Sequence, residues 1–375
     1  MHAMRRCLLA ALLITSIVCA PRLAQAVDSE PVIDEGAAAV VMDAGGEVLF
    51  DRNGEQELPP ASITKVMTAM VALDSGIPLD EPIAFVVVEY PEGAQLAGYK
   101  DGDTPTLREL LIVSLVYSGN DAAMNVAYAV GGSKEGFADL MNRKVEELGL
   151  SHTHFMNPHG LEEEGHYSNA RDLCTMGRYA LEHYPFIRDA VRMQGVDIVA
   201  DGKTIGLEST DELLKTYDGM LGIKTGNTES GASFLGAARR DLVTLYSCVL
   251  CCETREGRFK DSASLLDWGF GLYAERPLAR AERPMRVAQW QDGFWLRCPV
   301  SAQRSVNGSV FQGGEVTYQT VMLRPNALVS AGSTYGTTVW SQGDRHVGSV
   351  EYRATDDPVR SPAWNPFLLP LFDDA

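Results

Sequence analysis

Apolar positions along roughly the first 275 residues follow strand-like and helix-like spacings in turn. The apolar runs 37–42 and 47–50 flank Asp43-Ala44-Gly45-Gly46, which are typical turn residues, so they predict a β-hairpin. The pattern predicts further strands at 83–88, 233–239 and 242–250, the last two paired, and helices from 63 onward and at 107–116, 121–129, 134–148, 172–180 and 262–272. Asp121 is the expected cap of the helix that it begins.

The pattern changes at about residues 278–290. Residues 285–355 carry short segments rich in Val, Thr, Tyr and Trp, separated by Gly, Asn and Asp, with little helical spacing. They predict a small all-β domain of about one hundred residues or fewer. The tail 361–375 is apolar but ends in Asp373-Asp374, so it could make weak contact with a membrane or pack on its own domain.

The N-terminal residues have the composition of an export signal. A short basic segment precedes the apolar run 8–20, and Ala24-Gln25-Ala26 supplies the small residues that a signal peptidase reads. We therefore predict a signal peptide at 1–26 and an exported, extracytoplasmic protein, with an uncleaved membrane anchor as the alternative. Removal of these residues takes away three arginines and no acid, so the net charge moves from −18 to −21. A chain this acidic is not expected to bind nucleic acid non-specifically.

Five cysteines follow this segment: Cys174, Cys248, Cys251, Cys252 and Cys298. The adjacent pair ends a strand-like run, where neighbouring side chains point to opposite faces, so it does not have the spacing of metal ligands. Buried free thiols are the preferred interpretation, and at most one or two disulfides could form.

Three histidines close together invite a metal-site interpretation. His152, His154 and His159 have no glutamate partner on a helix, however, and Pro158-His159-Gly160 predicts a loop. We therefore expect no metal at this position.

One stretch carries chemistry that a buried helix does not need. Pro59-Pro60 precede the apolar helical run, and Lys65 follows Ser62 by three residues. Positions i and i+3 share a helix face, so the spacing holds a hydroxyl beside an amine, near the positive end of a helix dipole. Lysine can take the serine proton if desolvation lowers its pKa. The alternative is structural, with Ser62 as a helix cap and Lys65 reaching to solvent.

Two later stretches become informative together with the first. Ser118-Gly119-Asn120 is a tight loop between predicted helices, and its two polar side chains can point into one cleft; alone, it is an ordinary helix–helix turn. Lys224-Thr225-Gly226 follows a glycine-rich turn and is expected on a strand edge, where the glycine lets a ligand approach the backbone. Ser-x-x-Lys, Ser-x-Asn and Lys-Thr-Gly in this order match the motif set of β-lactamases and penicillin-binding proteins.

With these motifs the chain resembles a serine-type D-alanyl-D-alanine carboxypeptidase, a low-molecular-mass penicillin-binding protein. The resemblance covers about residues 30–275 closely. It implies a catalytic domain at 27–277 with the α/β (α+β) fold of serine β-lactamases and penicillin-binding proteins, in which helices flank an antiparallel sheet, and a small β-rich domain at 283–360. Family members often end in a basic amphipathic anchor, and the acidic tail departs from that pattern.

The resemblance also implies catalytic roles. Ser62 attacks the carbonyl between the two terminal D-alanines of a peptidoglycan stem peptide, Lys65 takes its proton, and Ser118 relays the proton to the leaving amine. Water then hydrolyses the ester, and β-lactam antibiotics acylate the same serine. No metal or organic cofactor is required.

A second set of residues is implied in substrate binding. Its members are Asn120, Lys224, Thr225, Gly226, Asn227 and Arg258. Asn120 is expected on the substrate's peptide group, Lys224 and Thr225 on its carboxylate, and the N–H groups of Ser62 and Asn227 in an oxyanion hole. Arg258 matches the family's arginine near the carboxylate pocket, with a surface ion pair as its alternative.

Three rival functions fit the same motifs. A class A β-lactamase carries Ser-Asp-Asn as its middle motif and a deacylating glutamate, whereas here Gly119 stands in the middle and Glu162-Glu163-Glu164 lacks the surrounding pattern. A D,D-endopeptidase stays open, as does a non-catalytic muropeptide-binding protein.

Overall fold

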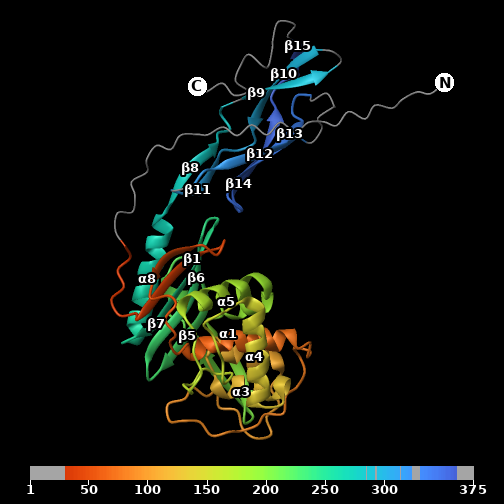
Figure 1. Ribbon diagram of the computed structural model, residues 1–375. Coiled ribbons are helices and arrows are strands. Elements are labelled where there is room, and N and C mark those ends of the chain that lie inside the picture. The colour runs from red at the N-terminus through yellow and green to blue at the C-terminus, as the bar shows by residue number, and fades with distance from the viewer. Residues whose placement is uncertain (1–29, 284, 292–293, 313, 323–329, 361–375) are drawn as a thin grey trace, which may run out of the picture. The chain divides into compact units, whose positions relative to one another are not determined.

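The computed structural model describes residues 30–283, 285–291, 294–312, 314–322 and 330–360, which form two compact units (Figure 1). One unit covers 27–271, and the other contains the chain from Leu272 onward. The predicted signal peptide 1–26 and the tail 361–375 lie outside the described residues.

The first unit is built on a five-stranded antiparallel sheet with the order β2-β1-β7-β6-β5. Its strands are β1 (Ala38–Asp43), β2 (Val48–Arg52), β5 (Met220–Thr228), β6 (Gly231–Arg240) and β7 (Val243–Cys252). The predicted N-terminal hairpin and the predicted pairing of 233–239 with 242–250 are confirmed. β5, which carries Lys224, lies at the edge of the sheet as predicted.

Helices cover both faces of this sheet, with α8 on one face and α1 and α5 on the other (Figure 1). The helices are η1 (Ala61–Ile63, a 3-10 turn), α1 (Thr64–Asp74), α2 (Leu107–Val116), α3 (Asn120–Gly131), α4 (Lys134–Leu148), α5 (Ala170–His183), α6 (Pro185–Ala190), α7 (Leu213–Thr216) and α8 (Arg255–Gly271). Because side chains alternate along a strand, the two faces of the sheet pack on different helices. Val40 and Cys248 belong to the core cluster that includes residues of α1 and α5, whereas Val41 and Leu245 lie beside Gly269 of α8.

Helix α1 lies at the centre of the larger core. Each residue from Thr64 to Ala72 is buried, so the helix has no solvent-facing stripe, as its uniformly apolar pattern predicts. Lys65 is among these residues and is fully buried. A hairpin of β3 (Gly195–Ala200) and β4 (Lys203–Glu208) completes the unit.

The predicted strand at 83–88 is wrong. These residues form no strand, although the N–H groups of Ile83 and Phe85 donate to Pro105 O at 2.8 Å and Asp103 O at 3.1 Å. The side chain of Asn125 on α3 takes the place of a partner strand, because its amide accepts from Val86 N at 2.7 Å and donates to Val86 O at 3.0 Å. The backbone hydrogen bonds of this segment therefore go to the loop at 103–105 and to a helix side chain rather than to a sheet.

Two helix boundaries also differ from the prediction. Helix α3 begins at Asn120, and Asp121 is not its cap: its carboxylate accepts the backbone N–H groups of Ala97 and Gly98. Helix α8 begins at Arg255 instead of 262, which places Arg258 in its first turn.

The second unit consists of β-strands, as the composition shift predicts. β8 (Tyr273–Ala279) pairs with β11 (Val306–Phe311), and the order β12-β13-β14-β10-β15, with β9 beside β10, forms a second sheet. The remaining bounds are β9 (Met285–Gln291), β10 (Phe294–Ala302), β12 (Thr317–Met322), β13 (Thr334–Gln342), β14 (Arg345–Ala354) and β15 (Val359–Arg360). The domain limits predicted from the sequence, 27–277 and 283–360, stay predictions.

The five described cysteines are free thiols, and all except the half-buried Cys251 are buried, which agrees with the preferred interpretation. Among the described residues, no helix combines the length and the apolarity that crossing a membrane requires.

Asp261 joins the N-terminal segment to α8. Its carboxylate accepts the N–H groups of Asp34 (2.9 Å), Glu35 (2.9 Å) and Gly36 (2.8 Å), and the residue is only 1% exposed.

Asp261→Ala leaves these donors without an acceptor, so we expect a loss of about 3 kcal/mol in the free energy of unfolding, measured with urea. Asp139→Ala on the exposed face of α4 should change it by less than about 0.5 kcal/mol. Equal losses in the two variants would contradict this role.

Candidate active site

The structure places Lys65 directly beside Ser62. The 3-10 turn η1 carries Ser62, α1 follows without a break, and the Lys65 Nζ lies 2.7 Å from the Ser62 Oγ. The i,i+3 spacing therefore produces the contact that the sequence predicts. Ser62 is partly exposed while Lys65 is buried, so the hydroxyl faces solvent and the amine lies behind it.

Lys65 has three oxygen partners, and they differ in kind. Nζ also donates to Asn120 Oδ1 and to the backbone carbonyl of His159, each at 2.7 Å. These two oxygens can only accept, whereas a serine hydroxyl can accept or donate. An amine that has lost one proton can keep both acceptor-only partners with its two N–H groups. Its lone pair then faces Ser62, which is the geometry of a general base.

The electrostatic surroundings favour this neutral form. Burial lowers the pKa of Lys65 well below its usual value, and the charge of Lys224 lowers it further, while Asp121 acts in the opposite direction. The amine is thus a candidate base rather than the solvent-reaching side chain of the structural alternative.

The loop that supplies the His159 carbonyl packs tightly on η1 and α1. Thr68 Oγ1 donates to Pro158 O at 2.6 Å. Gly160 has φ +85°, and a Cβ at this position would lie 1.8 Å from Ala61 O. Only glycine fits here, so the loop reaches Lys65 because residue 160 has no side chain.

His166 holds the same loop in place through Met156. Its Nδ1 accepts the N–H of Met156 at 3.0 Å, so the ring proton is on Nε2, which donates to Thr64 Oγ1 at 2.9 Å. Burial lowers the pKa of His166 to about 4, which keeps the ring neutral at physiological pH.

The three histidines weighed as metal ligands go to separate partners. His152 pairs with Glu57 at 3.3 Å, His154 donates to Gly165 O at 2.8 Å, and His159 Nδ1 accepts the N–H of Leu161 at 3.2 Å. Within the described ranges, no three metal-ligating side chains converge.

Ser118 lies in the turn between α2 and α3, and Asn120 is the first residue of α3. Ser118 is buried with φ +70°, a strained conformation for a residue other than glycine, and Asn120 is held by the bond from its N–H to Gln95 O at 2.8 Å. The turn brings the Asn120 side chain to Lys65 as described above. The Ser118 hydroxyl makes no hydrogen bond with another described residue, so its relay role stays a proposal.

The edge strand β5 passes directly beside the nucleophile turn. A Cβ on Gly226 would lie 2.7 Å from the Ala61 Cβ, so the missing side chain allows β5 to approach η1. Lys224 is buried and donates to Thr225 O at 3.1 Å, and Thr225 Oγ1 lies 2.6 Å from Thr210 Oγ1. Burial and then the charge of Arg258 lower the pKa of Lys224 to about 7. Asn227, which follows Gly226 on β5, is exposed.

Arg258 belongs to this site and not to the surface. It is buried, and its Nη1 donates to Gly226 O at 2.8 Å. Burial lowers its pKa to about 10, with Arg255 as the next cause. The alternative of a surface ion pair is therefore wrong, because the earlier start of α8 turns this residue inward.

Sequence reasoning missed several parts of the site. The His159 carbonyl is a backbone group and has no sequence signal, and the half-buried Thr210 and the buried Asp211 lie in a segment without a recognisable motif. Two members of the acidic run already have partners: Glu162 accepts the N–H of Ser230 at 2.9 Å, and Glu163 pairs with Lys134 at 2.9 Å.

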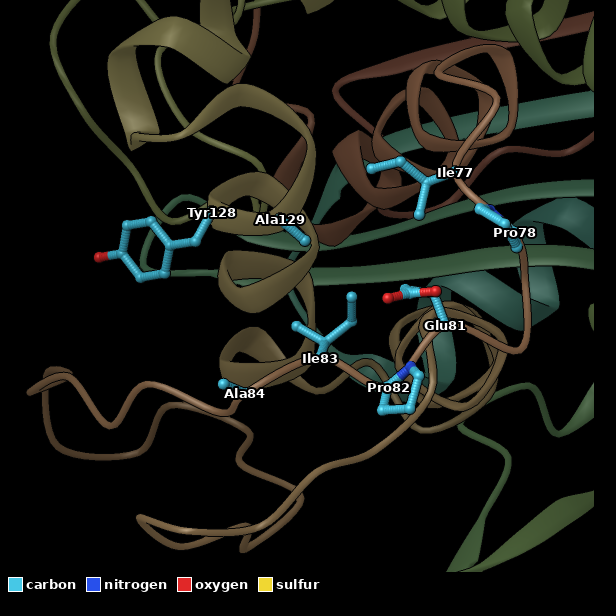
Figure 2. Close-up of a pocket in the computed structure, with 8 residues that line it drawn as sticks. All are labelled: Ile77, Pro78, Glu81, Pro82, Ile83, Ala84, Tyr128 and Ala129. Carbon is cyan, nitrogen blue, oxygen red and sulfur yellow. The ribbon is translucent and has the colours of Figure 1, made fainter.

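A hollow of about 550 Å³ lies elsewhere on this unit (Figure 2). It is lined by residues 77–84, in part, and by Tyr128 and Ala129 of α3. It contains none of the motif residues, so the candidate site is defined by the motif geometry.

Comparison with known proteins agrees with this geometry. The family model described as D-alanyl-D-alanine carboxypeptidase matches residues 24–254. The D-alanyl-D-alanine carboxypeptidase DacF of Bacillus subtilis is 31% identical over 265 residues, which cover 69% of this chain and 68% of the relative.

Solved structures extend the likeness. Penicillin-binding protein 5 from Haemophilus influenzae is 25% identical with a TM-score of 0.62, covering 88% of this chain and 99% of its own. Penicillin-binding protein D2 from Listeria monocytogenes in its ampicillin-bound form is 31% identical with a TM-score of 0.57, covering 63% of this chain and 97% of its own. The predicted fold, helices flanking an antiparallel sheet followed by a small β-rich unit, is confirmed. The chain therefore belongs to the D-alanyl-D-alanine carboxypeptidase family of serine hydrolases.

Proposed function

We propose that this protein removes the terminal D-alanine from peptidoglycan stem peptides through an acyl-enzyme on Ser62. The observation that supports it best is the position of Lys65, whose Nζ lies 2.7 Å from Ser62 Oγ and is held there by two acceptor-only oxygens. Membership of the family supplies the reaction, and this contact supplies its starting geometry.

In acylation, the Lys65 amine takes the hydroxyl proton as Ser62 Oγ attacks the carbonyl between the two D-alanines. The N–H groups of Ser62 and Asn227 hold the developing oxyanion, and each such donor is typically worth ~3 kcal/mol in the transition state. The proton passes through Ser118 to the departing D-alanine amine, and Asn120 orients the substrate's peptide group.

The substrate's free carboxylate lies against the other end of the site. Lys224 and Thr225 bind it by charge and by a hydroxyl hydrogen bond, and Arg258 supplies a second cation through its place behind Gly226. This requirement for a carboxylate selects chain ends over internal peptide bonds.

Water completes the cycle by hydrolysing the ester. Glu162 and Glu163 are both bound to residues other than Ser62, which favours slow hydrolysis of a penicilloyl ester over β-lactamase turnover. The protein should thus bind β-lactams covalently, in keeping with the ampicillin-bound relative.

The setting of this activity is also a proposal. Export by the signal peptide 1–26 would bring the domain 27–277 and the β-rich domain 283–360 to the cell wall. The tail 361–375 could add weak membrane contact.

Ser62→Ala should abolish both reactions of the site. We expect wild-type protein to release D-alanine from a peptide ending in D-Ala-D-Ala and to form an adduct with a fluorescent penicillin, and the variant to lose at least about a thousandfold in rate and all of the adduct. Equal rates in the two proteins would refute the nucleophile. An adduct without D-alanine release would favour the binding protein, and minutes-long survival of the adduct would exclude the β-lactamase.

A cross-linked muropeptide dimer separates carboxypeptidase from endopeptidase. Since Lys224, Thr225 and Arg258 are proposed to bind a free carboxylate, we expect release of terminal D-alanine to be faster than cleavage of the cross-link. Comparable rates, measured on one dimer that carries both bonds, would favour the D,D-endopeptidase.

Gly160→Ala tests the loop contact on Lys65. The new Cβ would collide with Ala61 O and displace the His159 carbonyl, so we expect acylation by penicillin to slow between about ten- and a hundredfold. Gly149→Ala is the matched control: it has a similar φ of +68°, but open space surrounds its Cβ. It should lower stability by ~1 kcal/mol through backbone strain alone and leave acylation unchanged. Equal slowing in both would contradict the proposed contact.

A further inference from the structure

A buried acid lies behind the carboxylate pocket and has no part in the mechanism above. Asp211 follows Thr210 and precedes the short helix α7. Thr210 Oγ1 lies 2.6 Å from Thr225 Oγ1, and Thr210 N donates to Val116 O at 3.2 Å. These contacts fix the segment between the Lys-Thr-Gly strand and the end of α2, which leads to Ser118.

The Asp211 carboxylate is only half used by hydrogen bonds. The residue is 6% exposed, and its Oδ1 accepts the N–H of Leu213 at 2.9 Å. Its Oδ2 is buried and has no hydrogen-bond partner among the described residues. A buried charged oxygen without a donor is costly unless nearby cations stabilise it.

Two cations are within its electrostatic reach. Burial raises the pKa of Asp211 to about 6; the backbone N–H groups of Leu213 and Leu214 act against that rise, followed by the charges of Lys224 and Arg258. In return, Asp211 raises the pKa of Lys224, which burial and Arg258 lower to about 7. Neither cation forms a direct ion pair with a carboxylate in the described part of the chain; Lys224 and Arg258 donate to the backbone oxygens of Thr225 and Gly226.

We propose that Asp211 is a positioning residue whose negative charge keeps Lys224 protonated. Because the site contains two buried lysines, Lys65 and Lys224, a positive charge on Lys224 leaves Lys65 as the neutral base. The inference rests on the proposed function, and it deepens the account of that site. It assigns to Asp211 no contact with the substrate.

The two buried lysines differ in the charges around them. Lys65 and Lys224 are both fully buried, and the charge of one disfavours charge on the other. Asp211 acts on Lys224, whereas the acid that acts on Lys65, Asp121, already accepts the N–H groups of Ala97 and Gly98. The less hydrogen-bonded of the two carboxylates therefore stands on the side of Lys224.

Other charged groups around Asp211 are accounted for. Arg258 on α8 faces it together with Lys224 on β5, and the adjacent Glu212 is exposed and acts on Arg258, as does Arg255. Lys224 must be protonated to bind a carboxylate, so removing the negative charge of Asp211 should lower the pH at which that binding is lost.

Asp211→Asn tests this directly, because the amide keeps an oxygen for the Leu213 N–H and removes the charge. The measurement is kcat/KM for D-alanine release from a D-Ala-D-Ala peptide between pH 5.5 and 9.5. We expect the alkaline limb to move down by about one pH unit, so that kcat/KM falls about tenfold at pH 8.5 and less than about threefold at pH 6. The loss should lie in KM.

Three variants complete the experiment. Asp211→Ser, a smaller acceptor for Leu213, should shift the limb as Asn does and serves if the Asn variant fails to fold. Asp211→Glu should restore the wild-type limb, and Asp218→Asn, the same change at an exposed site, should not move it. A folded, uncharged variant whose limb is unmoved, or a loss equal at all pH values, would overturn the inference. Wild-type protein that releases no D-alanine would instead refute the proposed function.

Discussion

The site depends on a lysine amine that is buried inside the protein. Lys65 is fully buried in a helix that is itself buried, and its Nζ reaches three oxygens from three separate segments. Burial of an ammonium group is costly, and the cost is reduced either by partners or by loss of the proton. Here the two acceptor-only oxygens supply partners for an amine of either charge, and the third position is left to the serine.

This arrangement requires close approach of three backbone segments. Gly160 reaches Ala61 from the loop side, and Gly226 reaches it from β5, in both cases closer than a side chain would allow. Ala61 itself has φ +52°, and Ser118 has φ +70°. Strained residues other than glycine persist only where the surrounding structure over-determines them. Both flank the reactive groups, so the packing that crowds the nucleophile turn also fixes its direction.

The sequence predicted the elements whose pattern is local. The helices at 107–116 and 134–148 match α2 and α4 because each has a continuous apolar face and a capping residue. The strand expected at 83–88 does not form, and the backbone of this segment bonds to the loop at 103–105 and to the side chain of Asn125. The apolar spacing of a segment does not reveal which distant residues its backbone groups will hydrogen-bond.

The same limit divides the candidate site. Ser62 and Lys65 were predictable because their spacing alone brings them together on one helix face. Arg258 was ambiguous because its orientation depends on where α8 begins. The His159 carbonyl and Asp211 could not be foreseen, since one is a backbone group and the other acts through tertiary placement.

In the proposed mechanism, two lysines of equal intrinsic basicity thus receive different tasks from their surroundings. Lys65 has an amide oxygen, a carbonyl and a hydroxyl around it, and its nearest acid is already hydrogen-bonded to backbone donors. Lys224 has a strand carbonyl and an acid whose second oxygen is free of donors. Environments that push the pKa values of paired groups apart are how one site obtains both a base and a cation at one pH. A fold that buried both amines in equivalent surroundings would have neither function at neutral pH, because the single charge would be shared between them.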